Sequence, residues 1–516
     1  MKDHYVLTID CGTQSLRAMI FSSNGTLEAI KKIEYVPYRE TAPGRAEQDA
    51  EVYWDSLIKA LLCLQEDSPE LYGRIEGIGV TTQRDSMVCL DSEGKPLRDA
   101  IIWLDQRKAH RIYEPGILMS QVYSFVGMSD TINKLQREGK SNWIKEFEPD
   151  IWEKTDSYVQ LSGFLNRRIT GRSGDSTASQ IGHIPFNYKK QRWATKGDIT
   201  AKLYPIDRKK LVELYAPSEK MGSVCKRFSE ITGIPEGLPV IACGSDKGCE
   251  TIGMGVVDSD RGSLSFGTTA TIQTTMDRYV EPLRFIPAYP ASIKGKYNPE
   301  IEIFRGFWMI SWFKEQFGFK EVQESLKTGR SPEEILNTML DTVPAGSMGL
   351  LTQPYWSPAL KNPTAKGSII GFGSVHTKAH LYRSMIEGLC FALLGGMHKI
   401  EKVTHRPMKV LTVSGGASRS SGICQIAADI FGLPILRGET SETSGLGAAA
   451  IVETGIGTYK TVEDAVTHMV KYADTFKPDQ KNHEIYKKLF AVYEKIFPSL
   501  RVLYQQIGEI THYPEI

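Results

Sequence analysis

Short apolar runs separated by tight turns dominate the first 35 residues and predict an antiparallel meander. The runs are Val6–Asp10, Arg17–Phe21 and Leu27–Tyr35, with Asn24-Gly25 between the last two. These turns are too short for the crossover that parallel strands need. Residues 49–64 then change to a helical period, with apolar side chains at positions 52, 57, 60 and 61. The chain therefore begins as a mixed α/β fold.

The same alternation of strands and helices continues through both halves of the chain. Strands are predicted at Ile75–Thr81, Met87–Asp91, Ala100–Trp103 and Leu238–Cys243, followed by a turn at residues 244–248. The second half repeats the theme with extended residues 261–275, helix Ala379–Leu394, strand Val410–Val413, helix Ser420–Phe431 and helix Leu446–Thr454. No Pro/Gly/Ser-rich linker is visible, so we expect two closely packed domains, residues 1–250 and 251–516, around a central cleft.

Two strand-turn-strand segments carry the most information in this pattern. Val6–Ile9 runs into Asp10-Cys11-Gly12-Thr13-Gln14-Ser15, and Ser263–Phe266 runs into Gly267-Thr268-Thr269. A tight turn of glycine and hydroxyl residues directs several backbone N–H groups at one point and so favours an anion. Two such turns about half a chain apart predict a duplicated core that binds one polyphosphate from both sides.

The composition is that of an ordinary enzyme and argues against several classes of binding partner. The 516 residues are 41% hydrophobic, which is enough for two or more domains with cores of their own. A net charge of +1 supplies no broad basic field, so we expect neither nucleic acid nor a membrane surface as a partner. The chain shows no signal peptide or membrane-length apolar run, and its eight cysteines contain no C-x-x-C. We therefore expect a cytoplasmic protein with reduced thiols.

Three motifs that resemble other binding sites have simpler interpretations. Gly139-Lys140-Ser141 resembles the end of a phosphate-binding loop, but Lys134 stands where that motif needs glycine. Gly445-x-Gly447-x-x-Ala450 fits the dinucleotide fingerprint by count, yet close helix packing explains it better. His376 and His380 lack a third metal ligand, so a helix cap and a surface residue are the better interpretation.

A third glycine cluster survives this comparison. Ser414-Gly415-Gly416-Ala417-Ser418 lies between a strand and a helix that Ser418 or Ser420 can cap. Without side chains at the glycines, a flat base can lie against the backbone, although a plain strand-to-helix turn would look the same. The cluster alone does not decide between these interpretations.

The three clusters, in this order, are typical of one protein family. The chain resembles the FGGY carbohydrate kinases, which share the ATPase core of actin, hexokinase and the heat-shock proteins, and the resemblance covers nearly its whole length. The motifs that carry it are Asp10–Ser15, Glu47-Gln48-Asp49 with Trp54, Gln83-Arg84-Asp85, Ile102–Arg107, Lys140–Trp143 with Glu148-Pro149, Gly244-Ser245-Asp246, Gly267-Thr268-Thr269, Gly367–Gly371 with His380–Glu387, and Gly415-Gly416-Ala417. The resemblance implies two ribonuclease-H-like domains with mixed sheets flanked by helices.

The resemblance also implies an ATP site with a general base. Asp246 would take the proton from the sugar hydroxyl, and Asp10 would hold Mg²⁺ through water. The residues expected to bind ATP are Gly12, Thr13, Gln14, Ser15, Arg17, Gly267, Thr268, Thr269, Gly415, Gly416, Ala417 and Ser420. These roles suit phosphoryl transfer, in which the protein mainly positions the reactants and neutralises charge.

The implied substrate is a small sugar or polyol, such as a ketopentose or a glycerol-like molecule. Its expected contacts are Gln83, Arg84, Asp85, Trp103, Asp105, Asp246 and Lys247. The loop Gln83-Arg84-Asp85 is closer to the glycerol kinase version of this motif than to the xylulokinase version, and Trp103 either stacks on the substrate or packs in the core.

Two residues depart from the family pattern and leave the substrate open. Lys247 stands where sugar kinases commonly carry an amide, and Phe372 replaces an aliphatic residue. An ammonium beside Asp246 either favours a carboxylate or carbonyl in the substrate or keeps the base ionised. The alternative function is a non-catalytic, actin-like assembly or sensor protein, which would need the phosphate turns but not Asp246 or Arg84. The sequence does not decide between a monomer and a homodimer.

Overall fold

The computed structural model describes residues 4–110, 129–356 and 365–513, which form two compact units. Unit 1 contains residues 1–257, 275–298 and 442–470, and unit 2 contains residues 258–274, 299–441 and 471–516. Among the helices in the described ranges, none is long and apolar enough to cross a membrane. All eight cysteines are free thiols, and six of them are buried.

A six-stranded mixed sheet forms the centre of unit 1. Its order is β13-β14-β5-β1-β2-β3, in which β1 pairs parallel with β5 and antiparallel with β2. The strands are β1 (Tyr5–Cys11), β2 (Ser15–Ser22), β3 (Leu27–Glu34), β5 (Ile75–Thr82), β13 (Lys220–Ser223) and β14 (Pro239–Ile241). The first three form the antiparallel meander that the short turns predict.

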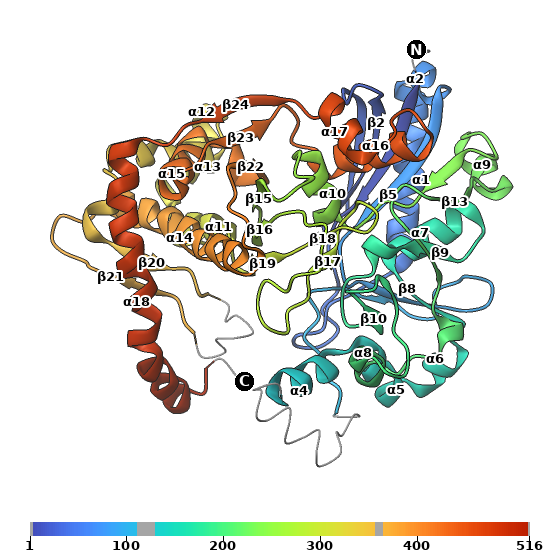
Figure 1. The fold of residues 1–516 in the computed structure, drawn as a ribbon, viewed down its shortest axis with the longest axis horizontal. Helices are drawn as coiled ribbons and strands as arrows, with labels where there is room; N and C mark the ends of the chain where they lie inside the picture. The colour runs from blue at the N-terminus through green and yellow to red at the C-terminus, as the bar shows by residue number, and fades with distance from the viewer. Residues whose placement is uncertain (1–3, 111–128, 357–364, 514–516) are drawn as a thin grey trace. The chain divides into compact units, whose positions relative to one another are not determined.

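Unit 2 is built on a sheet with the same plan. Its order is β19-β16-β15-β22-β23-β24, and these strands lie side by side in Figure 1. They are β15 (Arg261–Phe266), β16 (Ala270–Gln273), β19 (Glu300–Ile303), β22 (Val410–Ser414), β23 (Ile435–Gly438) and β24 (Tyr472–Phe476). Reading from β3 or from β19, both sheets run antiparallel, antiparallel, parallel, parallel, antiparallel. The core is therefore duplicated, as the two strand-turn-strand segments suggested.

Helices cover the sheets, and each unit buries an apolar core of its own. Those of unit 1 are α1 (Ala50–Asp67), α2 (Pro69–Tyr72), α4 (Ser129–Glu138), α5 (Lys140–Phe147), α6 (Pro149–Lys154), α7 (Leu161–Thr170), α8 (Ile199–Leu203), α9 (Lys226–Thr232), α10 (Asp246–Gly253), α16 (Thr443–Gly455) and α17 (Val462–Met469). Those of unit 2 are α11 (Trp308–Phe317), α12 (Phe319–Thr328), α13 (Pro332–Asn337), α14 (Lys378–Thr404), α15 (Ser421–Phe431) and α18 (Gln480–Thr511).

Both units also contain shorter strands. In unit 1 a second sheet joins β4 (Glu47–Gln48), β7 (Ala100–Ile101), β6 (Met87–Leu90) and β8 (Ser157–Gln160). The remaining pairs are β9 (Gly174–Ser176) with β12 (Glu213–Tyr215), β10 (Phe186–Asn187) with β11 (Arg192–Trp193), β17 (Tyr289–Pro290) with β18 (Tyr297–Asn298) and, in unit 2, β20 (Leu351–Gln353) with β21 (Ser368–Ile370).

The two units do not follow the single boundary expected near residue 250. Residues 275–298 and 442–470 lie beyond that boundary, yet they pack with the N-terminal part of the chain. Residues 442–470 belong to unit 1 because α16 packs on β5. The Val452 side chain of α16 fills the space over Gly77 and Gly79 of β5. A side chain at either glycine would collide with Val452, so β5 and α16 fit each other closely.

The backbones of α10 and α16 approach each other through a pair of glycines. A Cβ atom at Gly447 would lie 1.9 Å from the carbonyl oxygen of Cys249, and one at Gly253 would lie 1.9 Å from that of Thr443. The glycines of residues 445–450 therefore serve helix packing, as the sequence interpretation preferred.

The turn predicted at residues 244–248 is wrong, because a helix begins within it. Ser245 caps α10 by accepting a hydrogen bond from the backbone N–H of Gly248, and Asp246 is the first residue of the helix.

We expect Gly447→Ala to destabilise unit 1. Alanine is intrinsically favoured over glycine in a helix by about 1 kcal/mol, so propensity alone predicts the opposite sign. The collision with the Cys249 carbonyl should outweigh it, because overpacking typically costs about 1–3 kcal/mol and this contact is with backbone. Differential scanning fluorimetry should show the thermal midpoint falling by at least about 2–4 °C.

Gly197→Ala is the matched control, because a Cβ atom there has no heavy atom within 4 Å. Its midpoint should stay within about a degree of wild type, as for most surface substitutions. A Gly447→Ala protein as stable as the control would mean that α10 and α16 do not pack as tightly as their glycines require.

Candidate active site

The turn that joins β1 to β2 is held by a backbone hydrogen bond of its own and by the side chain of Tyr35. The backbone N–H of Gly12 donates to the carbonyl of Ser15 at 3.0 Å, and the hydroxyl of Tyr35 donates to the carbonyl of Gly12 at 2.6 Å. Thr13 is partly buried, whereas Gln14 is exposed. The turn is therefore rigid, with its tip accessible.

Thr13 connects this turn to the loop expected to bind the substrate. Its hydroxyl donates to Oε1 of Gln83 at 2.8 Å and accepts from Nε1 of Trp103 at 2.9 Å. Gln83 is buried, and its amide also donates to the hydroxyl of Tyr53 at 3.2 Å. Residues predicted separately for ATP and for the substrate thus meet within unit 1.

Asp85 is enclosed by basic side chains from two other segments. Lys140 Nζ lies 2.5 Å from Asp85 Oδ2, and His183 Nδ1 lies 2.9 Å from the same oxygen. Although burial alone would raise it, Lys140 and His183 lower the pKa of Asp85 well below its ordinary value. Asp85 has a positive φ of 49°, and a Cβ atom at Gly182 would lie 2.2 Å from its Oδ1, so glycine is required there.

Asp246 lies at the start of α10, next to charged partners on the same helix and on the substrate loop. Lys247 Nζ is 2.7 Å from Oε2 of Glu250, one turn along the helix, and Arg84 Nε donates to the hydroxyl of Ser245 at 3.3 Å. Burial raises the pKa of Asp246, while the charges of Arg84 and Lys247 oppose this rise. The carboxylate therefore accepts a proton more readily than an ordinary aspartate, as a general base requires.

Asp10, at the end of β1, belongs to the same charged region. Burial raises its pKa to about 7, Arg17 opposes the rise, and the carboxylates of Asp246, Glu442 and Glu250 add to it. Arg17 Nη1 is 3.7 Å from Asp10 Oδ2, and Arg17 Nε is 3.2 Å from Glu442 Oε2. Within the described ranges, no group of three or more His, Cys, Asp or Glu side chains is arranged to hold a metal ion directly.

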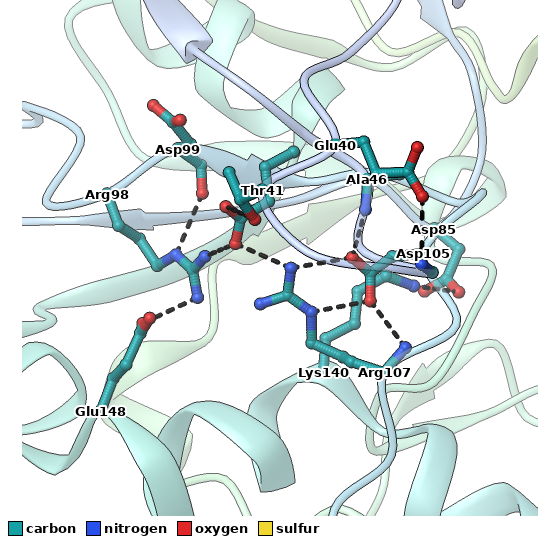
Figure 2. Close-up of polar contacts among 12 residues, drawn as sticks. Glu40, Thr41, Ala46, Asp85, Arg98, Asp99, Asp105, Arg107, Lys140 and Glu148 are labelled. Atoms are coloured by element: carbon teal, nitrogen blue, oxygen red, sulfur yellow. Dashed lines mark hydrogen bonds and ion pairs between the residues drawn. The ribbon is translucent and has the colours of Figure 1, made fainter.

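Asp105, an expected substrate contact, anchors the loop that carries Trp103. Its carboxylate accepts from Nε and Nη2 of Arg107 at 2.7 and 2.8 Å and from the backbone of Ala46 at 2.7 Å. Figure 2 shows Arg107 between Asp105 and a second set of acidic groups around Arg98. The side chain of Asp105 is only 1% exposed, so the geometry favours a supporting role over direct contact with a ligand.

In unit 2, two predicted nucleotide-binding segments come together. The turn Gly267–Thr269 joins β15 to β16, and Thr268 at its tip is exposed. Gly415 has a φ of 86°, and a Cβ atom on it would lie 2.9 Å from the backbone nitrogen of Gly267. Gly416 is exposed with open space beside it, Ala417 follows in the short 3₁₀ turn, and Ser420 caps α15 through the N–H of Ile423.

The remaining motifs have the structural roles that the sequence interpretation preferred. His380 forms a capping box with Thr377 at the start of α14, and His376 Nδ1 lies 2.8 Å from the backbone nitrogen of Gly373. Lys140 begins α5 and pairs with Asp85, so it is not part of a phosphate loop. Phe372 is 60% exposed after β21.

Sequence reasoning missed several residues of this region. Glu250 stands three residues after Lys247 on a helix, a spacing that could have revealed the pair. Sequence patterns do not reveal His183, Glu442 or Tyr289, whose ring lies against the guanidinium of Arg84, because each reaches the site from a distant part of the chain.

Comparison with known proteins gives a consistent result. The chain matches two family models, described as the FGGY family of carbohydrate kinases, N-terminal domain (residues 5–253) and C-terminal domain (residues 262–452). It is 27% identical to a xylulose kinase of Lactococcus lactis, covering 98% of both chains. It is 26% identical to a gluconokinase of Bacillus subtilis, covering 98% of this chain and 99% of the relative.

A solved structure supports the same fold. The ligand-bound xylulose kinase of Lactobacillus acidophilus superposes with a TM-score of 0.83 at 22% identity, covering 98% of this chain and 100% of that one. The expected fold class, two actin-like ATPase domains with mixed sheets, is thereby confirmed. Together, these findings show that the chain belongs to the FGGY family of carbohydrate kinases, enzymes that transfer a phosphoryl group from ATP to a sugar.

Proposed function

We propose that this kinase phosphorylates a neutral, hydroxyl-rich sugar or polyol, with Asp246 as the general base. A substrate hydroxyl gives its proton to Asp246 as its oxygen attacks the γ-phosphorus of ATP, and ADP leaves with the bridging oxygen. The observation that carries the proposal is the partly buried carboxylate of Asp246 at the first position of α10, where it interacts with the charges of Arg84, Lys247 and Glu250. Burial raises its pKa, which makes it a better proton acceptor.

Each unit contributes one glycine turn that is suited to the phosphates of ATP. Backbone N–H groups and hydroxyls of Gly12–Ser15 and of Gly267–Thr269 suit the binding of oxyanions. The open space beside Gly416 suits a flat base. Arg17, between Asp10 and Glu442, is near enough to the first turn to add positive charge.

Mg²⁺ fits this region through water. Asp10 offers a hard carboxylate oxygen, and Mg²⁺ usually keeps several waters when substrate phosphates supply the other ligands. When bound, the ion would neutralise charge that develops on the phosphates. Asp10 would orient its hydration shell, and the charge of Arg17 would oppose the rise in the pKa of Asp10.

The basic side chains around the base favour a neutral substrate over a sugar acid. Lys247 pairs with Glu250, Lys140 pairs with Asp85, and Arg84 donates to Ser245. Each ammonium group already has a carboxylate partner, so a substrate carboxylate would have to displace one and leave it buried. Burial alone would lower the pKa of Lys247, but Glu250 and Asp246 raise it, which supports its role in keeping the base ionised. We also expect the enzyme to act in the cytoplasm.

Asp246→Asn should lower kcat by at least about a hundredfold, because general base assistance contributes roughly 10²–10⁴. Asparagine keeps the size and hydrogen bonding of the side chain but cannot take a full proton. Coupled ADP release and ATP titration should show near-normal ATP affinity. Asp150→Asn, on the exposed first turn of α6, is the control and should be neutral. Turnover of Asp246→Asn within a few-fold of wild type would remove the residue from the base role.

Thr268→Val should weaken ATP use with the fold intact. Valine keeps the shape of threonine but removes the hydroxyl, and a hydrogen bond to a charged group contributes about 1.5–3 kcal/mol. We therefore expect the kcat/KM for ATP to fall roughly ten- to hundredfold. Thr328→Val is the matched control, since that hydroxyl donates to the Glu324 carbonyl of its own helix. Equal kinetics for both variants would exclude the second turn as a phosphate site.

The substrate class can be tested with a panel of ketopentoses, tetritols, glycerol and aldonates at equal concentration. We expect kcat/KM for the best neutral sugar or polyol to exceed that for any aldonate by at least about tenfold, since breaking a buried ion pair costs several kcal/mol. A preference for an aldonate would contradict the neutral-substrate proposal while leaving the base assignment intact.

A further inference from the structure

Arg84 lies over an aromatic ring supplied by a distant part of unit 1. Its guanidinium carbon is 5.1 Å from the centroid of the Tyr289 ring, within the range of a cation–π contact. Tyr289 begins β17, in the segment 275–298 that joins unit 1 although it lies far along the chain from the substrate loop. No local sequence pattern predicts this contact.

A second contact fixes Arg84 from another direction. Arg84 Nε donates to the hydroxyl of Ser245 at 3.3 Å, and the same hydroxyl caps α10 by accepting from the N–H of Gly248 at 3.3 Å. A planar guanidinium that is held at Nε and covered by a ring can turn only within narrow limits. Tyr289 and Ser245 therefore both restrict the directions of its N–H groups.

The ring of Tyr289 is itself held in place. It packs edge-on against Tyr188, with ring centroids 5.8 Å apart. The hydroxyl of Tyr188 donates to the carbonyl of Gly182 at 3.0 Å and lies 3.1 Å from its nitrogen. Gly182 is also the residue that leaves room for Asp85. One aromatic pair thus supports both charged residues of the loop Arg84-Asp85.

We propose that Tyr289 is a positioning residue for sugar selection, and that its ring sets the direction in which Arg84 meets the substrate hydroxyls. The proposal rests on the proposed role of Arg84 in substrate binding. It assigns to Tyr289 no contact with ATP and no part in proton transfer. The ring, and not the phenolic hydroxyl, is the feature that matters.

Kinetics of two substitutions separate the ring from the hydroxyl. Tyr289→Leu should lower kcat/KM for the sugar by roughly two- to thirtyfold, mainly through KM, and leave the KM for ATP unchanged. Tyr289→Phe should behave like wild type, because it keeps the ring. Tyr279→Leu, in the same segment but packed on Tyr297, is the control for general disturbance of residues 275–298.

A direct measurement on the sugar-free protein tests the contact itself. In ¹⁵N-arginine-labelled protein, the Nε–H signal of Arg84, assigned by its loss in Arg84→Lys, should shift in Tyr289→Leu and remain in Tyr289→Phe and Tyr279→Leu. If Tyr289→Leu leaves this signal in place, the proposal is wrong whatever the kinetics show. If Tyr289→Phe is as impaired as Tyr289→Leu, the hydroxyl carries the effect and the proposal is equally wrong. A wild-type protein that phosphorylates no sugar in the panel would overturn the proposed function, while the Arg84 signal would still decide the contact.

Discussion

The close approach of α10 and α16 is the constraint on which the rest of the site depends. Two glycines, Gly253 and Gly447, bring the helix backbones so near that any side chain would collide with a carbonyl oxygen. Ser444 adds a hydrogen bond from its hydroxyl to the carbonyl of Asp246 at 3.3 Å. Because Asp246 is the first residue of α10, the position of its carboxylate is set by helix packing and by the Ser245 cap. A rigid element holds the proposed base, as precise catalysis requires.

Charge compensation is the second theme of the site. Four carboxylates, Asp10, Asp246, Glu250 and Glu442, lie close enough together that their mutual repulsion contributes to the raised pKa of Asp10, and two of them, Asp10 and Glu250, are buried. Arginine and lysine side chains offset part of this charge, each from a different element. Placing several like charges close together costs free energy. Carboxylates with perturbed pKa values are concentrated at functional sites.

Local patterns predicted much of the fold because their causes are local. The meander of β1 to β3 follows from short turns, and the cap of α15 at Ser420 follows from residue type. The extra residues of unit 1 could not be found this way, because residues 442–470 join it through packing of α16 on β5, far away in sequence. The start of α10 was mistaken for a turn, since Gly244 and Gly248 flank a serine cap. Within the site, the spacing of Lys247 and Glu250 was readable, whereas the contact of Arg84 with Tyr289 depends on tertiary structure alone.

The late position of α16 in the chain has a consequence for synthesis. Strand β5 ends at Thr82, but the helix that covers its glycines begins at Thr443, about 360 residues later. At translation rates of about 5–20 residues per second, roughly 20 to 70 s pass between the synthesis of β5 and that of the helix that covers it. During this time Val6 and Ile241, which are fully buried in the finished protein, have no α16 to pack against. A fragment that stops near residue 250 would lack α16 and would leave this apolar face uncovered.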